Sequence, residues 1–111
     1  MKKIDQKGFD IVKISQALAN DTRLQILDWL KNPKENFPPC EEFPFEVNEE
    51  LGVCVSRIQK KSGLSQSTIS NYIDQLERAQ LLTSKREGRW TYIKRDEKRI
   101  EEYILYLSTH L

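Results

Sequence analysis

Residues 66–71 carry short polar side chains of the types that contact the edges of base pairs. Gln66, Ser67, Thr68, Ser70 and Asn71 offer amides and hydroxyls over less than two helical turns, with no charge among them. Such groups pair with the donors and acceptors in the major groove of DNA. A helix that serves only as scaffold more often exposes Lys and Glu, and Ser and Asn are poor helix formers. The composition therefore favours a helix that reads DNA over a scaffold helix.

Two short helices around a tight turn are predicted over residues 55–80, and they must position these side chains. Ser65 suits an N-cap, and Gly63 and Leu64 suit the turn before it. Over residues 65–79, apolar side chains recur at helical spacing and predict a buried stripe, with polar side chains opposite. The stripe consists of Ile69, Tyr72, Ile73, Leu76 and Ala79, and the opposite side of Ser67, Asn71, Asp74 and Arg78.

A β-hairpin with basic arms is predicted directly after this pair of helices. Glu87 and Gly88 lie between two β-prone segments in LLTSKREGRWTYIKRD. Trp90 and Ile93 are expected to anchor the hairpin to the body. Cations on such a hairpin would neutralise DNA phosphates, although a solvated hairpin without a partner is the alternative. The cations are Lys85, Arg86, Arg89, Lys94 and Arg95.

With these motifs in order, the chain resembles the ArsR family of small bacterial winged-helix repressors. The resemblance covers nearly the whole chain and is clearest in ALANDTRLQIL at 17–27, GLSQSTISNYIDQLERAQLL at 63–82 and REGRWTYIKRD at 86–96. It implies a mainly α winged helix-turn-helix of order α-α-α-α-β-β-α, dimeric through its first and last helices. It also implies binding of double-stranded DNA at a pseudo-palindromic operator, with repression until an effector is sensed.

The polar N-terminal side of the 65–79 helix, here called the reading edge, and the predicted hairpin, called the wing, then supply the expected contacts with DNA. Bases are expected to be contacted by Gln66, Ser67, Ser70 and Asn71, and phosphates by Thr68, Lys61, Arg86 and Arg89.

Length and charge are compatible with this interpretation. The 111 residues predict one domain, 1–111, and the net charge is only +1. The charge is uneven, because residues 51–99 hold eleven Lys or Arg against five Asp or Glu, whereas residues 40–50 hold five Glu and no cation. No apolar run approaches the length of a membrane span and no signal peptide is recognised, so a cytoplasmic protein is expected.

The remaining elements are expected to build the body and the dimer. Helices are predicted at 9–19, from Phe9, Val12, Ile14 and Leu18, and at 21–31, capped by Asp21 or Asn20. A helix over 96–110 places apolar side chains on one face for the dimer seam, although they could instead close a monomer core. The Pro/Glu/Phe-rich loop at 32–50 contains all four prolines, and its Phe37, Phe43 and Phe45 are expected to pack onto the body or the partner. The buried side chains expected from the second helix are Leu24, Ile26, Leu27 and Leu30, and those on the seam are Ile100, Tyr103, Ile104, Leu107 and Leu111.

The two cysteines leave the effector open. Metal-sensing members of the family carry a Glu-Leu-Cys-Val-Cys pattern near the start of their third helix, where this chain has Glu50-Leu51-Gly52-Val53-Cys54. Cys54 alone is insufficient for soft-metal capture, so Cys40 would have to join it. A Cys40–Cys54 redox pair, a metal or metalloid site, and two structural thiols all remain alternatives.

No cofactor, metal site or enzyme activity is expected. The single His110 cannot build the nitrogen-rich zinc site of other family members, and no phosphate loop or catalytic set is recognised. The alternatives to a sensing repressor are a constitutive repressor and a winged-helix protein-interaction module without specific DNA binding.

Overall fold

A computed structural model of the chain describes residues 10–111, and Phe9 of the first predicted helix lies outside them. Six helices and three strands follow one another as α1 (Ile11–Leu18), α2 (Asp21–Lys31), α3 (Pro33–Asn36), β1 (Val53–Cys54), α4 (Val55–Ser62), α5 (Gln66–Arg78), β2 (Leu82–Glu87), β3 (Trp90–Arg95) and α6 (Glu97–His110). The expected fold class is confirmed, with the short α3 and the strand β1 added to it. The molecule is elongated, with extents of 51 × 25 × 25 Å.

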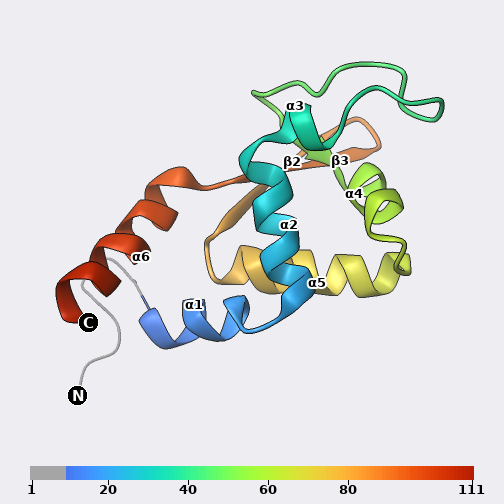
Figure 1. The fold of residues 1–111 in the computed structure, drawn as a ribbon. Coiled ribbons are helices and arrows are strands. Elements are labelled where there is room, and N and C mark those ends of the chain that lie inside the picture. The colour runs from blue at the N-terminus through green and yellow to red at the C-terminus, as the bar shows by residue number, and fades with distance from the viewer. Residues whose placement is uncertain (1–9) are drawn as a thin grey trace.

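The helical body forms where apolar periodicity and polar caps coincide in the sequence. Asn20 caps α2 by accepting a hydrogen bond from the Arg23 backbone N–H at 2.9 Å, and Asp10 and Asp96 cap α1 and α6 in the same way. Helices α1, α2 and α4 pack against α5 (Figure 1). The apolar stripe of α5 contributes Ile69, Ile73 and Leu76 to the core. Leu24, expected to be buried, is 48% exposed instead, because the body covers only part of α2. Val12 of α1 is 38% exposed.

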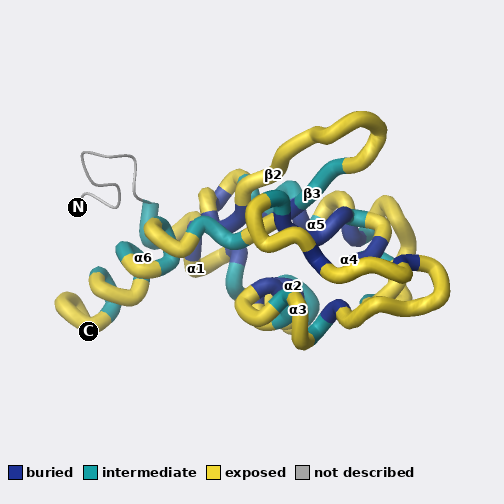
Figure 2. Tube along the Cα trace, turned by 90° about the horizontal axis from the view of Figure 1, so that it is seen from above, coloured by how far each residue is buried: buried dark blue, intermediate teal, exposed yellow. Residues whose placement is uncertain are grey.

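The wing is part of a three-stranded antiparallel sheet of order β1-β3-β2. The hairpin β2–β3 turns at Gly88 and Arg89, one residue later than predicted, because Glu87 is the last residue of β2 and pairs with Trp90. Its tip extends away from the body into solvent (Figure 2). Ile93 anchors it, being 1% exposed and paired with Val53 of β1. Trp90 does not anchor it, because its ring lies near the exposed tip at 42% exposure.

Strand β1 approaches β3 closely because residue 52 is glycine. Gly52 has a φ of +101°, and a Cβ there would lie 2.2 Å from the carbonyl oxygen of Ile93. Any side chain at this position would collide with the backbone of β3 as well as adopt an unfavourable left-handed conformation.

The segment between α3 and β1 is irregular, but it packs onto α4. Phe37, Phe43 and Val47 are buried, whereas Phe45 is 54% exposed. The guanidinium of Arg57, itself 5% exposed, donates hydrogen bonds to the carbonyls of Phe37 at 2.7 Å and Pro38 at 2.9 Å. Arg57 therefore holds the segment to the body and contributes nothing to a basic outer surface.

Helix α6 projects from the body beside α1 and covers it only in part (Figure 1). Ile100, Tyr103 and Tyr106 pack against the core, and the Tyr103 hydroxyl is hydrogen-bonded to Ser15 of α1 at 3.1 Å. No residue of α6 is fully buried, and Ile104 and Leu105 are 58% and 66% exposed. An apolar face of α6 is thus left uncovered in the single chain.

Candidate nucleic-acid interface

The turn between α4 and α5 is built by local capping. Gly63 ends α4 in the left-handed region at φ 71°, and its N–H bonds back to the carbonyls of Gln59 and Lys60. The Ser65 side chain accepts a hydrogen bond from the Thr68 backbone N–H at 3.2 Å and so caps α5. Both predicted roles are confirmed, and together they make α4 and α5 a helix-turn-helix.

Helix α5 exposes its polar N-terminal side chains and buries its apolar stripe. Ile69, Ile73 and Leu76 are buried, whereas Tyr72 is half-buried. The four side chains expected to contact bases are all exposed, on the first two turns of the helix: Gln66, Ser67, Ser70 and Asn71.

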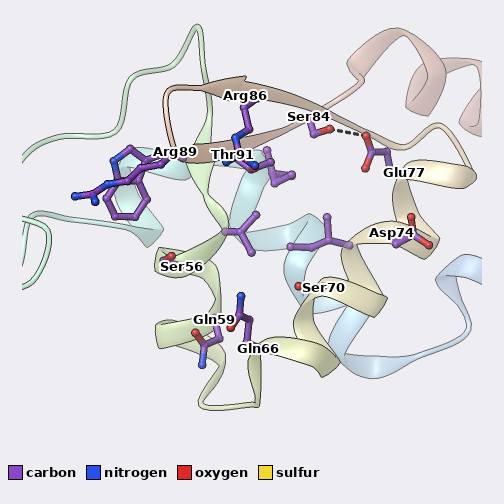
Figure 3. Close-up of a pocket in the computed structure, with 14 residues that line it drawn as sticks. Ser56, Gln59, Gln66, Ser70, Asp74, Glu77, Ser84, Arg86, Arg89 and Thr91 are labelled. Atoms are coloured by element: carbon purple, nitrogen blue, oxygen red, sulfur yellow. Dashed lines mark hydrogen bonds between the residues drawn. The ribbon is translucent and has the colours of Figure 1, made fainter.

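A groove of about 500 Å³ lies between this helix, α4 and the wing (Figure 3). Of the predicted contact residues, it brings together Gln66 and Ser70 from α5 with Arg86 and Arg89 from the hairpin. Ser67 and Asn71 do not line it, although they lie on the exposed side of the same helix. One continuous surface thus carries amides and hydroxyls beside two guanidinium groups.

The arginines of the wing have weak internal partners. Arg86 donates to the carbonyl of Gly88 at 3.1 Å, and the Arg89 guanidinium lies 5.8 Å from the centre of the Trp90 ring. Neither is paired with a carboxylate within the described residues. Both side chains are exposed, so their charge is free to neutralise phosphate. Arg95 differs, because it donates to Glu97 and to the carbonyl of Leu27 and holds β3 to the body.

Two predicted phosphate contacts lie elsewhere. The Thr68 hydroxyl accepts a hydrogen bond from Ser65 at 2.8 Å and takes part in the cap of α5. The Lys61 ammonium lies 5.3 Å from the centre of the Trp29 ring and 5.7 Å from that of Phe37, so it faces the α2–α3 side of α4. Lys61 does not line the groove.

The groove also contains residues that sequence reasoning had not selected as contacts. Ser56 and Gln59 of α4 line it. Their spacing of three residues, which places two polar side chains on the same face of a helix, could have predicted this from the sequence. Asp74 and Glu77 place carboxylates at its α5 wall, where the Ser84 hydroxyl donates to Glu77 at 2.6 Å and Arg78 pairs with Asp74 at 2.8 Å. These partners offset part of the negative charge beside the reading edge.

The cysteines do not reproduce the thiolate pair of metal-sensing relatives. Cys54 is buried at the end of β1, ahead of α4 rather than within it, and Cys40 is exposed in the preceding segment. Both are free thiols, and residue 52 has no room for a third. Within residues 10–111 no group of three His, Cys, Asp or Glu side chains is placed to hold a metal ion. The chain therefore lacks the closely spaced cysteine pair of the metal-sensing pattern, because Gly52 occupies the position of its first cysteine.

A sheet-anchored hairpin beside a capped helix-turn-helix defines the class of winged helix-turn-helix proteins. No helix in the described part of the chain is long and apolar enough to cross a membrane. A scan against models of known protein families gives no match.

Comparison with known proteins identifies the family. The chain is 42% identical over 100 residues to the HTH-type transcriptional regulator YbzH of Bacillus subtilis, covering 90% of this chain and 97% of YbzH. It is 29% identical over 86 residues to the protein named arsenical resistance operon repressor ArsR2 of Halobacterium salinarum, covering 78% of this chain and 59% of that protein. The chain belongs to the ArsR family of winged helix-turn-helix transcriptional regulators.

Solved structures share the fold. The homodimeric winged helix-turn-helix DNA-binding domain Mb0332 of Mycobacterium bovis matches with a TM-score of 0.61 at 24% identity, covering 89% of this chain and 76% of that one. The transcriptional regulator HlyU of Vibrio vulnificus matches with a TM-score of 0.55 at 26% identity, covering 90% and 86%.

Proposed function

We propose that this regulator is a homodimeric, sequence-specific repressor that binds a pseudo-palindromic operator in double-stranded DNA. The observation that carries the proposal is the joint surface of α5 and the wing, where an uncharged polar edge lies beside two exposed arginines. Base readout needs donors and acceptors at fixed positions, and phosphate contact needs unpaired cations at the flank. The name of ArsR2 as a repressor supports repression as the outcome of binding.

In the proposed complex, α5 enters the major groove with its N-terminal turns leading. Asn71 and Gln66 are the side chains suited to pair with adenine through two hydrogen bonds, and Ser67 and Ser70 donate or accept beside them. Arg86 and Arg89 contact the flanking backbone or minor groove, and Thr68 approaches a phosphate from the start of α5. Lys61 is not assigned a phosphate, because its ammonium lies over Trp29 and Phe37.

The dimer is proposed to form through α1 and α6. Ile104 and Leu105 leave an apolar surface on α6, and the homodimeric state of Mb0332 supports an assembly that covers it. A two-fold dimer sets two copies of α5 about one helical turn of DNA apart, roughly 34–36 Å. We further propose that residues 1–111 act as one DNA-binding domain in the cytoplasm, where such an operator is accessible.

Binding to DNA from the region upstream of its own gene tests this function, with and without reductant. Tight binding that survives excess non-specific DNA is expected, and loss of selectivity would instead favour a protein-docking role for the winged helix. Weaker binding after mild oxidation, absent in Cys40→Ser and Cys54→Ser variants, would assign the thiols a sensing role. Equal binding in both states would make them structural.

A further inference from the structure

A second cavity lies on a different side of α4 from the DNA groove. It has a volume of about 220 Å³, and its surface is mostly apolar. Ser56 and Gln59 of α4 line the groove, whereas other residues of the same helix line this cavity together with the segment that follows α3. The lining that matters here comes from Phe37, Cys40, Phe43, Arg57, Lys60 and Lys61.

Aromatic rings form the apolar walls of the cavity. Phe37 and Phe43 line it. The Trp29 ring is not part of the lining, but it packs edge-to-face against Phe37 with ring centres 6.2 Å apart. Side chains of this kind supply most of the contact surface in small-molecule sites, and a few polar groups set the orientation of the ligand. The charged side chains in the lining of this cavity are all cations, namely Arg57, Lys60 and Lys61.

Of the three cations, only Lys61 is left without a strong acceptor. Arg57 is occupied by the carbonyls of Phe37 and Pro38. Lys60 is paired with Glu42, whose hydrogen bond is the largest cause that raises the pKa of Lys60. Within residues 10–111, Lys61 has no carboxylate in ion-pair range, and its ammonium lies only over aromatic rings.

We propose that this cavity binds a small organic carboxylate with an apolar body. The carboxylate contacts the Lys61 ammonium, and the apolar body lies against Phe37 and Phe43. The volume is below the roughly 300–1,000 Å³ of drug-sized sites, so the ligand is an acid with about one ring rather than a nucleotide.

Helix α4 connects this cavity to the DNA groove. It forms one wall of each, and it leads directly into the turn that positions α5. If α4 can adopt two positions, a ligand that binds one of them more tightly shifts the protein toward that position. The resulting change in DNA affinity is limited by the difference between the ligand's affinities for the two positions of α4. In this respect the inference rests on the proposed function and gives the repressor an effector.

Ligand binding is tested without DNA by the fluorescence of Trp29. The sequence has two tryptophans, so Trp90→Phe in the full chain leaves Trp29 as the reporter. Cyclohexanecarboxylate is the probe, with cyclohexanecarboxamide as the uncharged control and acetate as the anion without an apolar body. A saturable change is expected with cyclohexanecarboxylate alone.

Matched lysine variants locate the site. Lys61→Gln is expected to weaken binding about tenfold, since it removes the charge-assisted contact, whereas Lys61→Arg and the exposed Lys31→Gln on α2 should retain it. Circular dichroism checks that each variant is folded. The proposal is overturned if Lys61→Gln binds as well as the parent, if the carboxamide binds equally, or if no saturable change occurs up to the solubility limit.

Operator titrations of the unmodified chain, with and without cyclohexanecarboxylate, test the effector role. A reproducible shift in operator affinity supports it, and an unchanged affinity at saturating ligand overturns it. Failure to bind any operator would count against the proposed function, while the fluorescence result would still decide whether the cavity is a ligand site.

Discussion

Asn71 lies exposed on the second turn of α5, without a hydrogen-bond partner among the described side chains that would hold it away from DNA. Asn is suited to adenine, because its amide NH2 can donate to N7 while its carbonyl oxygen accepts from the N6 amino group in the same plane. The position on the helix, rather than the residue type alone, makes this side chain a candidate for base readout.

Asn71→Ala is expected to weaken operator binding by about 1–3 kcal/mol and to relax selectivity at one position of each half-site. Competition titrations with single-base operator variants measure both effects. Gln25→Ala, which removes an exposed amide from α2, is the control and should change neither. Intact discrimination in Asn71→Ala would place the reading edge elsewhere on α5.

Gly52 shows a residue whose role depends on its backbone and its neighbour together. Its φ of +101° and the 2.2 Å approach of a hypothetical Cβ to the Ile93 carbonyl leave space for glycine alone. The Cys found at the equivalent position of the family's Glu-Leu-Cys-Val-Cys pattern would need a rearranged β1.

Gly52→Ala is expected to lower the free energy of unfolding by more than about 1 kcal/mol, because steric overlap adds to left-handed strain. Gly63→Ala and Gly88→Ala are matched controls, since both positions have positive φ and open space around a Cβ. Urea denaturation measures all three. Equal losses would mean that backbone strain alone, and not contact with β3, determines the cost at residue 52.

At the level of elements, the wing and α5 form one surface because a side-chain hydrogen bond and strand pairing fix the position of the wing on the body. The Ser84–Glu77 hydrogen bond joins β2 to α5, and Ile93 anchors β3 against β1. The tip beyond these links carries Arg86 and Arg89 into solvent. Its cations are therefore suited to phosphate contact that does not depend on base sequence.

Arg89→Ala is expected to weaken binding to all DNA sequences by a similar factor and to reduce the salt dependence of log K by about one unit. Titrations at several salt concentrations, on operator and non-specific DNA, measure the change. Lys98→Ala on α6 removes an equal charge outside the groove and should leave the slope unaltered. A loss confined to the operator would assign Arg89 to base readout instead.

At the level of the whole molecule, the apolar side chains of α6 lie far from the DNA groove along the long axis. Figure 1 shows α6 and α1 at one end and the wing at the other. In the proposed dimer, one end of the chain would contact the partner copy and the other end would contact DNA. A two-fold assembly would then set the spacing of the two α5 helices.

Ile104→Glu is expected to dissociate the dimer and abolish tight operator binding, because it buries a charge in an apolar seam. The single chain should remain folded, since Ile104 is 58% exposed in it. Analytical ultracentrifugation and circular dichroism separate the two effects. Thr109→Glu on the same helix is the control, and dissociation by both variants would argue against a specific seam through Ile104.

The sequence by itself determined the elements with strong local signals. Ser65 was predicted as a cap and is one, and of the two candidate caps of α2 the structure uses Asn20. Helix α2 also spans the predicted residues, because capping and apolar periodicity act over a few neighbouring positions. The exposure of Gln66, Ser67, Ser70 and Asn71 also followed from periodicity alone.

Only the tertiary structure decided what each cation and each loop residue does. Arg57, Lys61 and Arg95 all appear in the sequence as basic residues near the motif, yet each has a partner that lies 19 to 68 positions away along the chain. Strand β1 was not predicted, because a strand of two residues is too short to show an alternating pattern. Its pairing with β3 depends on the close backbone approach at Gly52. The charge of a side chain depends only on its residue type and can be predicted from the sequence. The partners of that side chain depend on which distant segments the fold brings together, so only the tertiary structure reveals them.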